Sequence, residues 1–185
     1  FAPIWLIIAL MQKYKIKNWI ISIGLTALVV GLLTLPFSNG NVFVWLYELY
    51  SKKIFVQQLH VITANAFNLW SAIAGIHEKP DILPFLGLTY QAWGYILFLI
   101  AYIPLLKNVY KDHSTKNIVW VLALTAFSSF VLLTNMHERY LYPLFPYLTI
   151  LLLYNSISLL PYIFISLLSL LNMYNFWFVP KIPVL

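Results

Sequence analysis

Apolar runs of about twenty residues recur along the chain and restrict its fold more than any other feature. A helix that crosses the hydrocarbon core of a bilayer needs about this length, because its backbone polar groups must be paired within the segment. The chain has 185 residues, of which 62% are hydrophobic and only 9% are charged. That is too little charge to cover the surface of a soluble domain of this size. The sequence therefore predicts an all-α fold, a polytopic transmembrane helix bundle.

Lysines beside the apolar runs set the expected topology. One basic loop contains Lys13, Lys15 and Lys17, and a second runs from Lys107 to Lys116. The positive-inside rule places both loops in the cytoplasm, so the polar residues between the intervening spans should lie outside it. The predicted spans are residues 19–37, 86–106, 118–134, 143–155 and 159–178, preceded by a truncated span at residues 1–11.

Residues 1–11 are apolar but shorter than a span. Neither a basic n-region nor a small-residue cleavage site marks them as a signal peptide. We expect them to be the tail of a span that begins upstream. The chain is then expected to be the C-terminal part of a single transmembrane domain in a multi-pass integral membrane protein.

Residues 42–75 are predicted to form an amphipathic segment on the outer face. Over residues 54–75 the helical period places Asn65 and Asn68 on a polar face, opposite a stripe of leucine, isoleucine and tryptophan. A helix of this kind lies in the interface plane of a membrane. Gly75 is its expected C-cap.

Three smaller features complete the prediction for this outer part. Trp70 is expected to be a membrane anchor at the headgroup level. Residues 42–50, which are rich in aromatic side chains, are expected to form a second, shorter interfacial helix. Residues 77–81, His-Glu-Lys-Pro-Asp, are expected to form a solvated turn.

The charge and the composition exclude several classes of function. The formal net charge of +6 is carried by lysines in short clusters beside apolar spans, a topology signal, so we expect no nucleic-acid partner. The chain has no cysteine, so disulfides and thiolate catalysis are excluded. Because Leu141 stands where a zincin needs its second histidine, His137 and Glu138 do not form that motif. A magnesium or manganese ion held by Glu138 and a substrate phosphate is left open as a cofactor.

Residues 135–143 hold an unusual group of ionisable side chains between two apolar runs. Arg139 is the only arginine of the chain and lies next to His137 and Glu138. Its guanidinium presents paired donors that match the oxygens of a phosphate, and Tyr140 and Tyr142 flank it with rings suited to the headgroup level. His137 can donate to a leaving phosphate or orient a sugar. The alternative is a solvated helix end with a Glu–Arg pair and an aromatic belt.

Two blocks of the sequence resemble a known family. Residues 136–143, Met-His-Glu-Arg-Tyr-Leu-Tyr-Pro, resemble the His-Glu-Arg-Tyr-Leu-(Tyr/Phe)-Pro signature near the C-terminus of prokaryotic multi-pass glycosyltransferases. These enzymes belong to the GT-C superfamily and are akin to the mannosyltransferase that adds the second mannose of GPI anchors. Residues 63–70, Thr-Ala-Asn-Ala-Phe-Asn-Leu-Trp, resemble a second block of the same family. The two blocks occur in the family's order.

The resemblance implies a hexosyltransferase, mannosyltransferase-like, in a prokaryotic plasma membrane. Such an enzyme takes a sugar from a polyprenyl-phosphate donor and passes it to a hydroxyl of a glycan, lipid or protein acceptor on the non-cytoplasmic side. The implied substrate-binding residues are Asn65, Asn68, His137, Glu138, Arg139 and Tyr140. The family's general base is an acidic residue in an N-terminal outer loop that this chain lacks. No catalytic residue is therefore assigned here, and the chain alone is expected to be inactive.

Two functions other than sugar transfer also fit these sequence features. In one, the protein binds or transports a lipid without chemistry, and Arg139 and the two asparagines hold the headgroup; membrane lipids are partners in either case. A transporter is expected to have broken spans with polar residues near the midplane, whereas the polar residues here lie at the outer ends of the predicted spans. In the other, the chain is a structural subunit of a larger membrane complex.

Overall fold

The computed structural model describes residues 1–54 and 60–177 and divides the chain into two compact units. The larger unit comprises Phe1–Ile8 and His60–Leu185, and the smaller unit comprises Ala9–Leu59. Helix α1 (Ala2–Met11) contributes to both units.

The smaller unit consists of a long apolar helix, a turn and a short helix. Helix α2 (Ile16–Thr34) continues into the 3-10 turn η1 (Leu35–Phe37) and has no buried residue. Helix α3 (Val42–Glu48) begins at Asn41, whose side chain accepts a hydrogen bond from Val44 N, and ends in the π-helical turn η2 (Leu49–Ile54). A helix over most of residues 42–50 is thus confirmed, while its place at a membrane interface stays a prediction.

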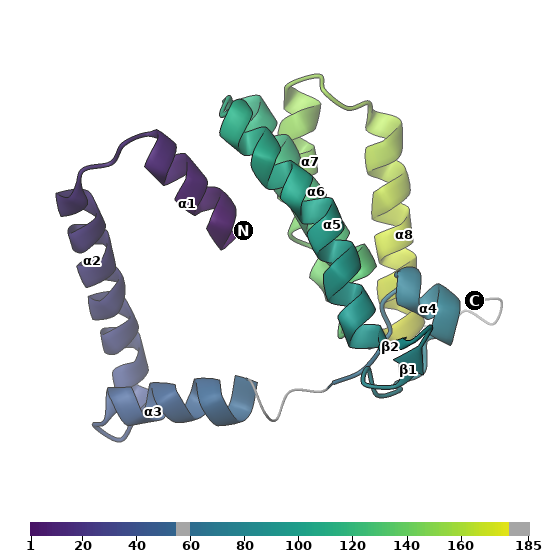
Figure 1. Cartoon of the computed structure of the whole chain (residues 1–185), viewed down its shortest axis with the longest axis horizontal. Coiled ribbons are helices and arrows are strands. Elements are labelled where there is room, and N and C mark those ends of the chain that lie inside the picture. Colours follow the sequence, from purple (N-terminus) through teal and green to yellow (C-terminus); the bar gives the residue numbers. More distant parts are fainter. Residues whose placement is uncertain (55–59, 178–185) are drawn as a thin grey trace. The chain divides into compact units, whose positions relative to one another are not determined.

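The larger unit contains helices α5 to α8 and a small hairpin formed by β1 and β2 (Figure 1). Three of these helices begin at a cap or a turn: Thr89 caps α5, Ser114 caps α6, and Pro143 precedes α7. The elements in chain order are α4 (Leu69–Ala74), β1 (Pro84–Phe85), β2 (Leu88–Thr89), α5 (Tyr90–Lys111), α6 (Thr115–Leu132), η3 (Glu138–Leu141), α7 (Leu144–Leu153) and α8 (Leu159–Trp177).

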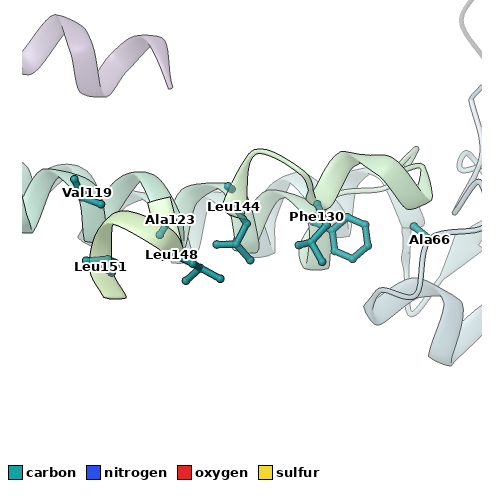
Figure 2. Close-up of a cluster of buried hydrophobic side chains, with 9 residues drawn as sticks. Ala66, Val119, Ala123, Phe130, Leu144, Leu148 and Leu151 are labelled. Atoms are coloured by element: carbon teal, nitrogen blue, oxygen red, sulfur yellow. The ribbon is translucent and has the colours of Figure 1, made fainter. Parts of the chain in front are cut away.

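Helix α6 is the centre of the larger unit because it is buried on two sides. On one side, residues spaced three or four apart pack against α7 and form the cluster in Figure 2, whose labelled members are Ala66, Val119, Ala123, Phe130, Leu144, Leu148 and Leu151. On the other side, Val121 and Leu122 pack with Tyr102 and Val109 of α5 and with Ile4 and Ile8 of α1. Burial at this spacing on both sides is expected of a helix with no polar face.

Helices α2, α5 and α6 are long and apolar enough to cross a membrane. The candidate spans are Ile16–Phe37, Tyr90–Lys111 and Thr115–Leu132. The structure therefore confirms a mostly helical chain with apolar helices of membrane length, close to the ranges predicted for them. Helix α7 has only 10 residues, or about 15 Å of rise, half of the hydrocarbon thickness. Spanning by α1, α7 and α8 stays a prediction.

The predicted amphipathic helix over residues 54–75 is wrong within the described residues. Residues 55–59 lie outside them, residues 60–68 contain no helix, and only Leu69–Ala74 is helical. The cause is tertiary, because the backbone of residues 60–64 pairs with other loops of the larger unit. Asn65, with a φ of +60°, also interrupts any helix. Gly75 is confirmed as the C-cap of α4, with a φ of +84°.

Candidate functional site

The two sequence blocks meet through backbone hydrogen bonds. Asn135 N donates to Val61 O at 2.9 Å, and Ala64 N donates to Met136 O at 2.9 Å. Bridges of β type also join Ala64 and Asn65 to His137. The loop that carries His137 is therefore held in register against residues 61–65, although the two are far apart in the sequence. Residues 60–68 and residues 134–139 together form a junction of the two blocks.

Asparagines make the turns that this junction needs. Asn65 and Asn135 both have left-handed backbones, with φ values of +60° and +62°. Asparagine adopts this conformation more readily than other residues with a Cβ, since its short amide can bond locally. The Thr63 hydroxyl also bonds both Ala66 N and Ala66 O. The presence of Asn65 and Thr63 in the first block is therefore explained by the backbone conformation that they stabilise, without any role in binding.

Glu138 lies at the bottom of the site with its carboxylate buried. Its relative exposure is 1%, and it begins the 3-10 turn η3. Oε1 is 3.4 Å from Arg139 Nη1, and Oε2 is 4.0 Å from His137 Nδ1. Oε2 has no hydrogen-bond partner in the part of the chain that the structure describes. A buried carboxylate without a full set of partners is costly, which marks this position for a role beyond folding.

The side chains of Arg139 and His137 flank this carboxylate, and Tyr140 lies beside both of them. The Arg139 side chain is 50% exposed, and its guanidinium carbon lies 5.8 Å from the centre of the Tyr140 ring. The His137 ring meets the same tyrosine edge to face at 5.1 Å. Tyr140 thus holds the guanidinium and the imidazole beside one aromatic surface. The arrangement presents donors to an anion, and the buried Glu138 fixes the guanidinium from below.

Asn68 lies in the junction, but its side chain forms hydrogen bonds with the backbone of the fold. It is 7% exposed, and its Oδ1 caps α4 by accepting from Trp70 N and Ser71 N. Its Nδ2 donates to Phe130 O of α6 at 3.3 Å. The predicted polar face with Asn65 and Asn68 side by side is therefore wrong, since residues 65–68 are not helical and Asn68 points inward. Its assigned role in substrate binding stays a prediction.

Trp70 is a core residue and not a membrane anchor. It is 1% exposed, and its Nε1 donates to Leu132 O at 2.7 Å. Its ring meets Phe85 and Tyr90 edge to face at 6.5 Å and 5.6 Å. The prediction failed because a tryptophan next to polar residues is typical of a headgroup belt, while here the partners of the ring come from elements 15 or more positions away.

Asn172 of α8 is a residue that sequence reasoning missed. It is 2% exposed; its Nδ2 donates to Asn65 O at 2.6 Å and its Oδ1 accepts from Phe67 N at 3.0 Å. One amide thus satisfies two backbone groups of the junction. An asparagine within a mostly apolar helix is a signal for such a contact, because a polar group there needs a partner.

The predicted solvated turn at residues 77–81 is wrong for Asp81, which is buried. It is 1% exposed, its Oδ2 accepts from the Thr134 hydroxyl at 3.4 Å, and its Oδ1 has no partner among the described residues. Burial raises the pKa of the Asp81 carboxyl, while the charge of His60 and the Thr134 hydrogen bond act in the opposite direction. His77, Glu78 and Lys79 are exposed as predicted.

Helix α5 supports the junction from the side of Asp81. Gln91 N donates to Asp81 O at 3.0 Å, and Asp81 N donates to His60 O at 3.3 Å. Gly94 allows α5 to come close, because a Cβ at this position would lie 3.1 Å from Thr134 N and 3.2 Å from Leu132 O. The loop that leads into His137 is therefore held from two sides.

Among residues 1–54 and 60–177, no three histidine, aspartate or glutamate side chains come together in a group that could hold a metal ion. Glu138 is the single carboxylate of the junction's second block. An ion shared between Glu138 and a substrate phosphate, as left open above, would need only this one protein ligand and stays a prediction.

The comparisons with known proteins gave no relative. No protein family, curated protein or solved structure matches the chain.

Proposed function

We propose that the chain is part of a membrane glycosyltransferase of the GT-C type. It would transfer a hexose, with mannose as the first candidate, from a polyprenyl-phosphate donor to a hydroxyl acceptor on the non-cytoplasmic side of the membrane. One observation carries the proposal. The two blocks that resemble the family form one junction, and the single arginine projects from it beside a buried carboxylate.

The donor phosphate would bind to the exposed donors of the junction. Arg139 supplies a charged planar fork for two phosphate oxygens, and His137 can donate to a third. Tyr140 adds an aromatic surface between them. Negative charge on the phosphate grows as it leaves the sugar, so cationic donors at this place would stabilise the transition state more than the ground state.

The reaction itself would be a single displacement. The acceptor oxygen forms a bond to the anomeric carbon while the bond from that carbon to the phosphate oxygen breaks, and the phosphate leaves with the electron pair. A general base takes the proton of the acceptor hydroxyl. The resemblance assigns this base to an outer loop that is not part of this chain, so Glu138 is proposed to hold the arginine and to have no role as a base.

The test is sugar transfer by membranes that contain the complete protein to which this chain belongs. The probe is radiolabelled mannosyl-phosphoryl-polyprenol, and the readout is label in an acceptor fraction, with binding of polyprenyl phosphate measured in parallel. Label transfer that disappears in Arg139→Ala supports the proposal. Binding of the lipid phosphate without transfer would favour the alternative, a non-catalytic lipid-binding or transport protein.

A further inference from the structure

The hairpin before α5 presents apolar side chains at its surface. Ile82, Leu86 and Leu88 have relative exposures of 67%, 78% and 42%. The sequence from Ile82 to Leu106 contains no charged residue. The uncharged stretch that forms most of α5 therefore begins with this hairpin and not with the helix.

The turn of the hairpin carries a residue that the turn itself disfavours. Phe85 pairs with Leu88, so Leu86 and Gly87 form a two-residue turn, with φ values of +47° and +85°. Such turns favour asparagine before glycine. A leucine in the left-handed region costs about 1–2 kcal/mol. Leu86 is thus both strained and exposed, and a strained exposed leucine points to a role outside the fold.

The hairpin also lengthens the uncharged stretch of α5. The apolar part of α5, residues 90–106, measures about 25 Å at the usual rise per residue, whereas the hydrocarbon core is about 30 Å thick. Two strand residues add about 7 Å at the start of the helix. Helix and hairpin tip together therefore match the thickness of the apolar layer.

Backbone polar groups of the hairpin have hydrogen-bond partners within the protein, as an environment with little water requires. Strands β1 and β2 pair with each other, Tyr90 N donates to Leu83 O at 3.2 Å, and Trp93 Nε1 donates to Phe85 O at 2.9 Å. The Phe85 ring stacks on Tyr90 at 4.8 Å. Paired backbone groups are a condition for insertion at the headgroup and acyl boundary.

We infer that the hairpin, with Leu86 in its turn and Leu88 in β2, inserts among lipid acyl chains in the leaflet at which α5 begins, and that Ile82 just before β1 faces the same lipids. Its occupant is the bilayer itself, because the tip continues the apolar surface of a candidate span. The insertion fixes the depth of the junction, since Asp81 and Lys79 directly before the hairpin bond to His60 and Ile62. The inference does not depend on sugar transfer.

A fluorescent probe at the tip tests the inference in the full chain. The chain has no cysteine, so Leu86→Cys gives a single thiol for an environment-sensitive dye. The protein is placed in nanodiscs of phosphatidylcholine and phosphatidylglycerol that contain a lipid with a nitroxide near the headgroup end of the acyl chain. Glu78→Cys, in the exposed turn before the hairpin, is the matched control.

The dye at Leu86→Cys is expected to emit at shorter wavelength and to be quenched by the nitroxide lipid about two-fold more than the dye at Glu78→Cys. Water-like emission without lipid quenching at position 86 would overturn the inference. Emission typical of an apolar environment without lipid quenching would also overturn it, because a protein surface would then cover the tip.

Leu86→Asn separates insertion from a role in folding. Asparagine suits the turn better than leucine, so the melting temperature in detergent should stay equal or rise. In the same background, a dye at Leu88→Cys should lose about half of its quenching by the nitroxide lipid, because the tip has lost its most exposed apolar side chain. Unchanged quenching at position 88 would contradict insertion.

Discussion

The side-chain amide of Asn172 is joined to the backbone of Asn65, 107 positions earlier, by a hydrogen bond of 2.6 Å from Nδ2 to the carbonyl oxygen. The same amide accepts from Phe67 N at 3.0 Å. Asn65 in turn bridges His137. Helix α8 thus holds the backbone of residues 65–67 in its place in the proposed site.

Asn172→Ala should destabilise the larger unit. The change leaves two backbone groups, Asn65 O and Phe67 N, without their partner, and the expected loss is about 1–3 kcal/mol. The measurement is thermal unfolding of the protein in detergent. Leu170→Ala on the same helix is the control, since Leu170 is 64% exposed and should matter little. Equal melting temperatures for the two variants would show that the amide is dispensable.

Asp81→Asn should make the protein more stable, and more so as the pH rises. Burial raises the pKa of Asp81 in the folded protein, so above the unfolded value of about 3.9 the folded state holds its proton more tightly than the unfolded state. The free energy of unfolding of the wild type therefore falls as the pH rises through the folded pKa. Asparagine keeps an acceptor for the Thr134 hydroxyl and does not ionise, so the free energy of unfolding of Asp81→Asn should not show this fall at rising pH.

Asp112→Asn gives the matched control with the opposite sign. Hydrogen bonds from Ser114 lower the pKa of the Asp112 carboxyl, so its contribution to stability is present above its unfolded pKa and is lost as the pH falls through the folded one. Melting temperatures between pH 4 and pH 8 should therefore rise for Asp81→Asn and fall for Asp112→Asn, relative to the wild type at neutral pH. Parallel curves for Asp81→Asn and the wild type would mean that Asp81 carries no buried charge.

The apolar helices could be predicted from the sequence because their signal is local. Thr89 and Ser114 cap the starts of α5 and α6, and Pro143 and Pro146 mark the first turn of α7. These residues act within one turn of the helix that they begin. The short α3 was predicted for the same reason, from a run of aromatic residues after a turn.

The junction could be predicted only in part. The resemblance implied one set of substrate-binding residues drawn from both blocks, but no residue pattern predicted how the His137 loop meets the Asn65 block. The non-helical form of residues 60–68 depends on Val61 and Ala64 finding backbone partners more than 70 positions away. The spacing of hydrophobic residues along the chain carries no information about such distant partners, and over residues 54–75 this spacing favoured a helix. The burial of the Asn68 and Trp70 side chains could not be predicted for the same reason, because it depends on contacts with residues distant in the sequence.

Arg139→Lys in the complete protein should remove most transferase activity while the protein still accumulates. Lysine keeps the charge but loses the planar fork, and removing one such donor from a developing anion costs about 10²–10³ in rate. The Glu138 contact at 3.4 Å would also change. Lys116→Arg, the reverse exchange at an exposed position of α6, is the control. Activity like that of the wild type in Arg139→Lys would remove the phosphate role.

Single cysteines should report the side of the membrane on which the site lies. Because the chain has no native cysteine, each introduced thiol is unique. Tyr142, His77 and Asn108 are all exposed in the structure, so their reactivity depends only on the side that an impermeant thiol reagent can reach. Cysteines at Tyr142 and His77, near the His137 loop and the hairpin, should react from outside intact cells.

A cysteine at Asn108 should react only after the membrane is made permeable. It lies in the last turns of α5, between Lys107 and Lys111, and the positive-inside rule places this end in the cytoplasm. If α5 crosses the bilayer, its two ends must differ in labelling, whatever chemistry the site performs. Labelling of Asn108→Cys from outside, together with protection of His77→Cys, would invert the topology. The His137 site would then face the cytoplasm, where the proposed acceptor is absent.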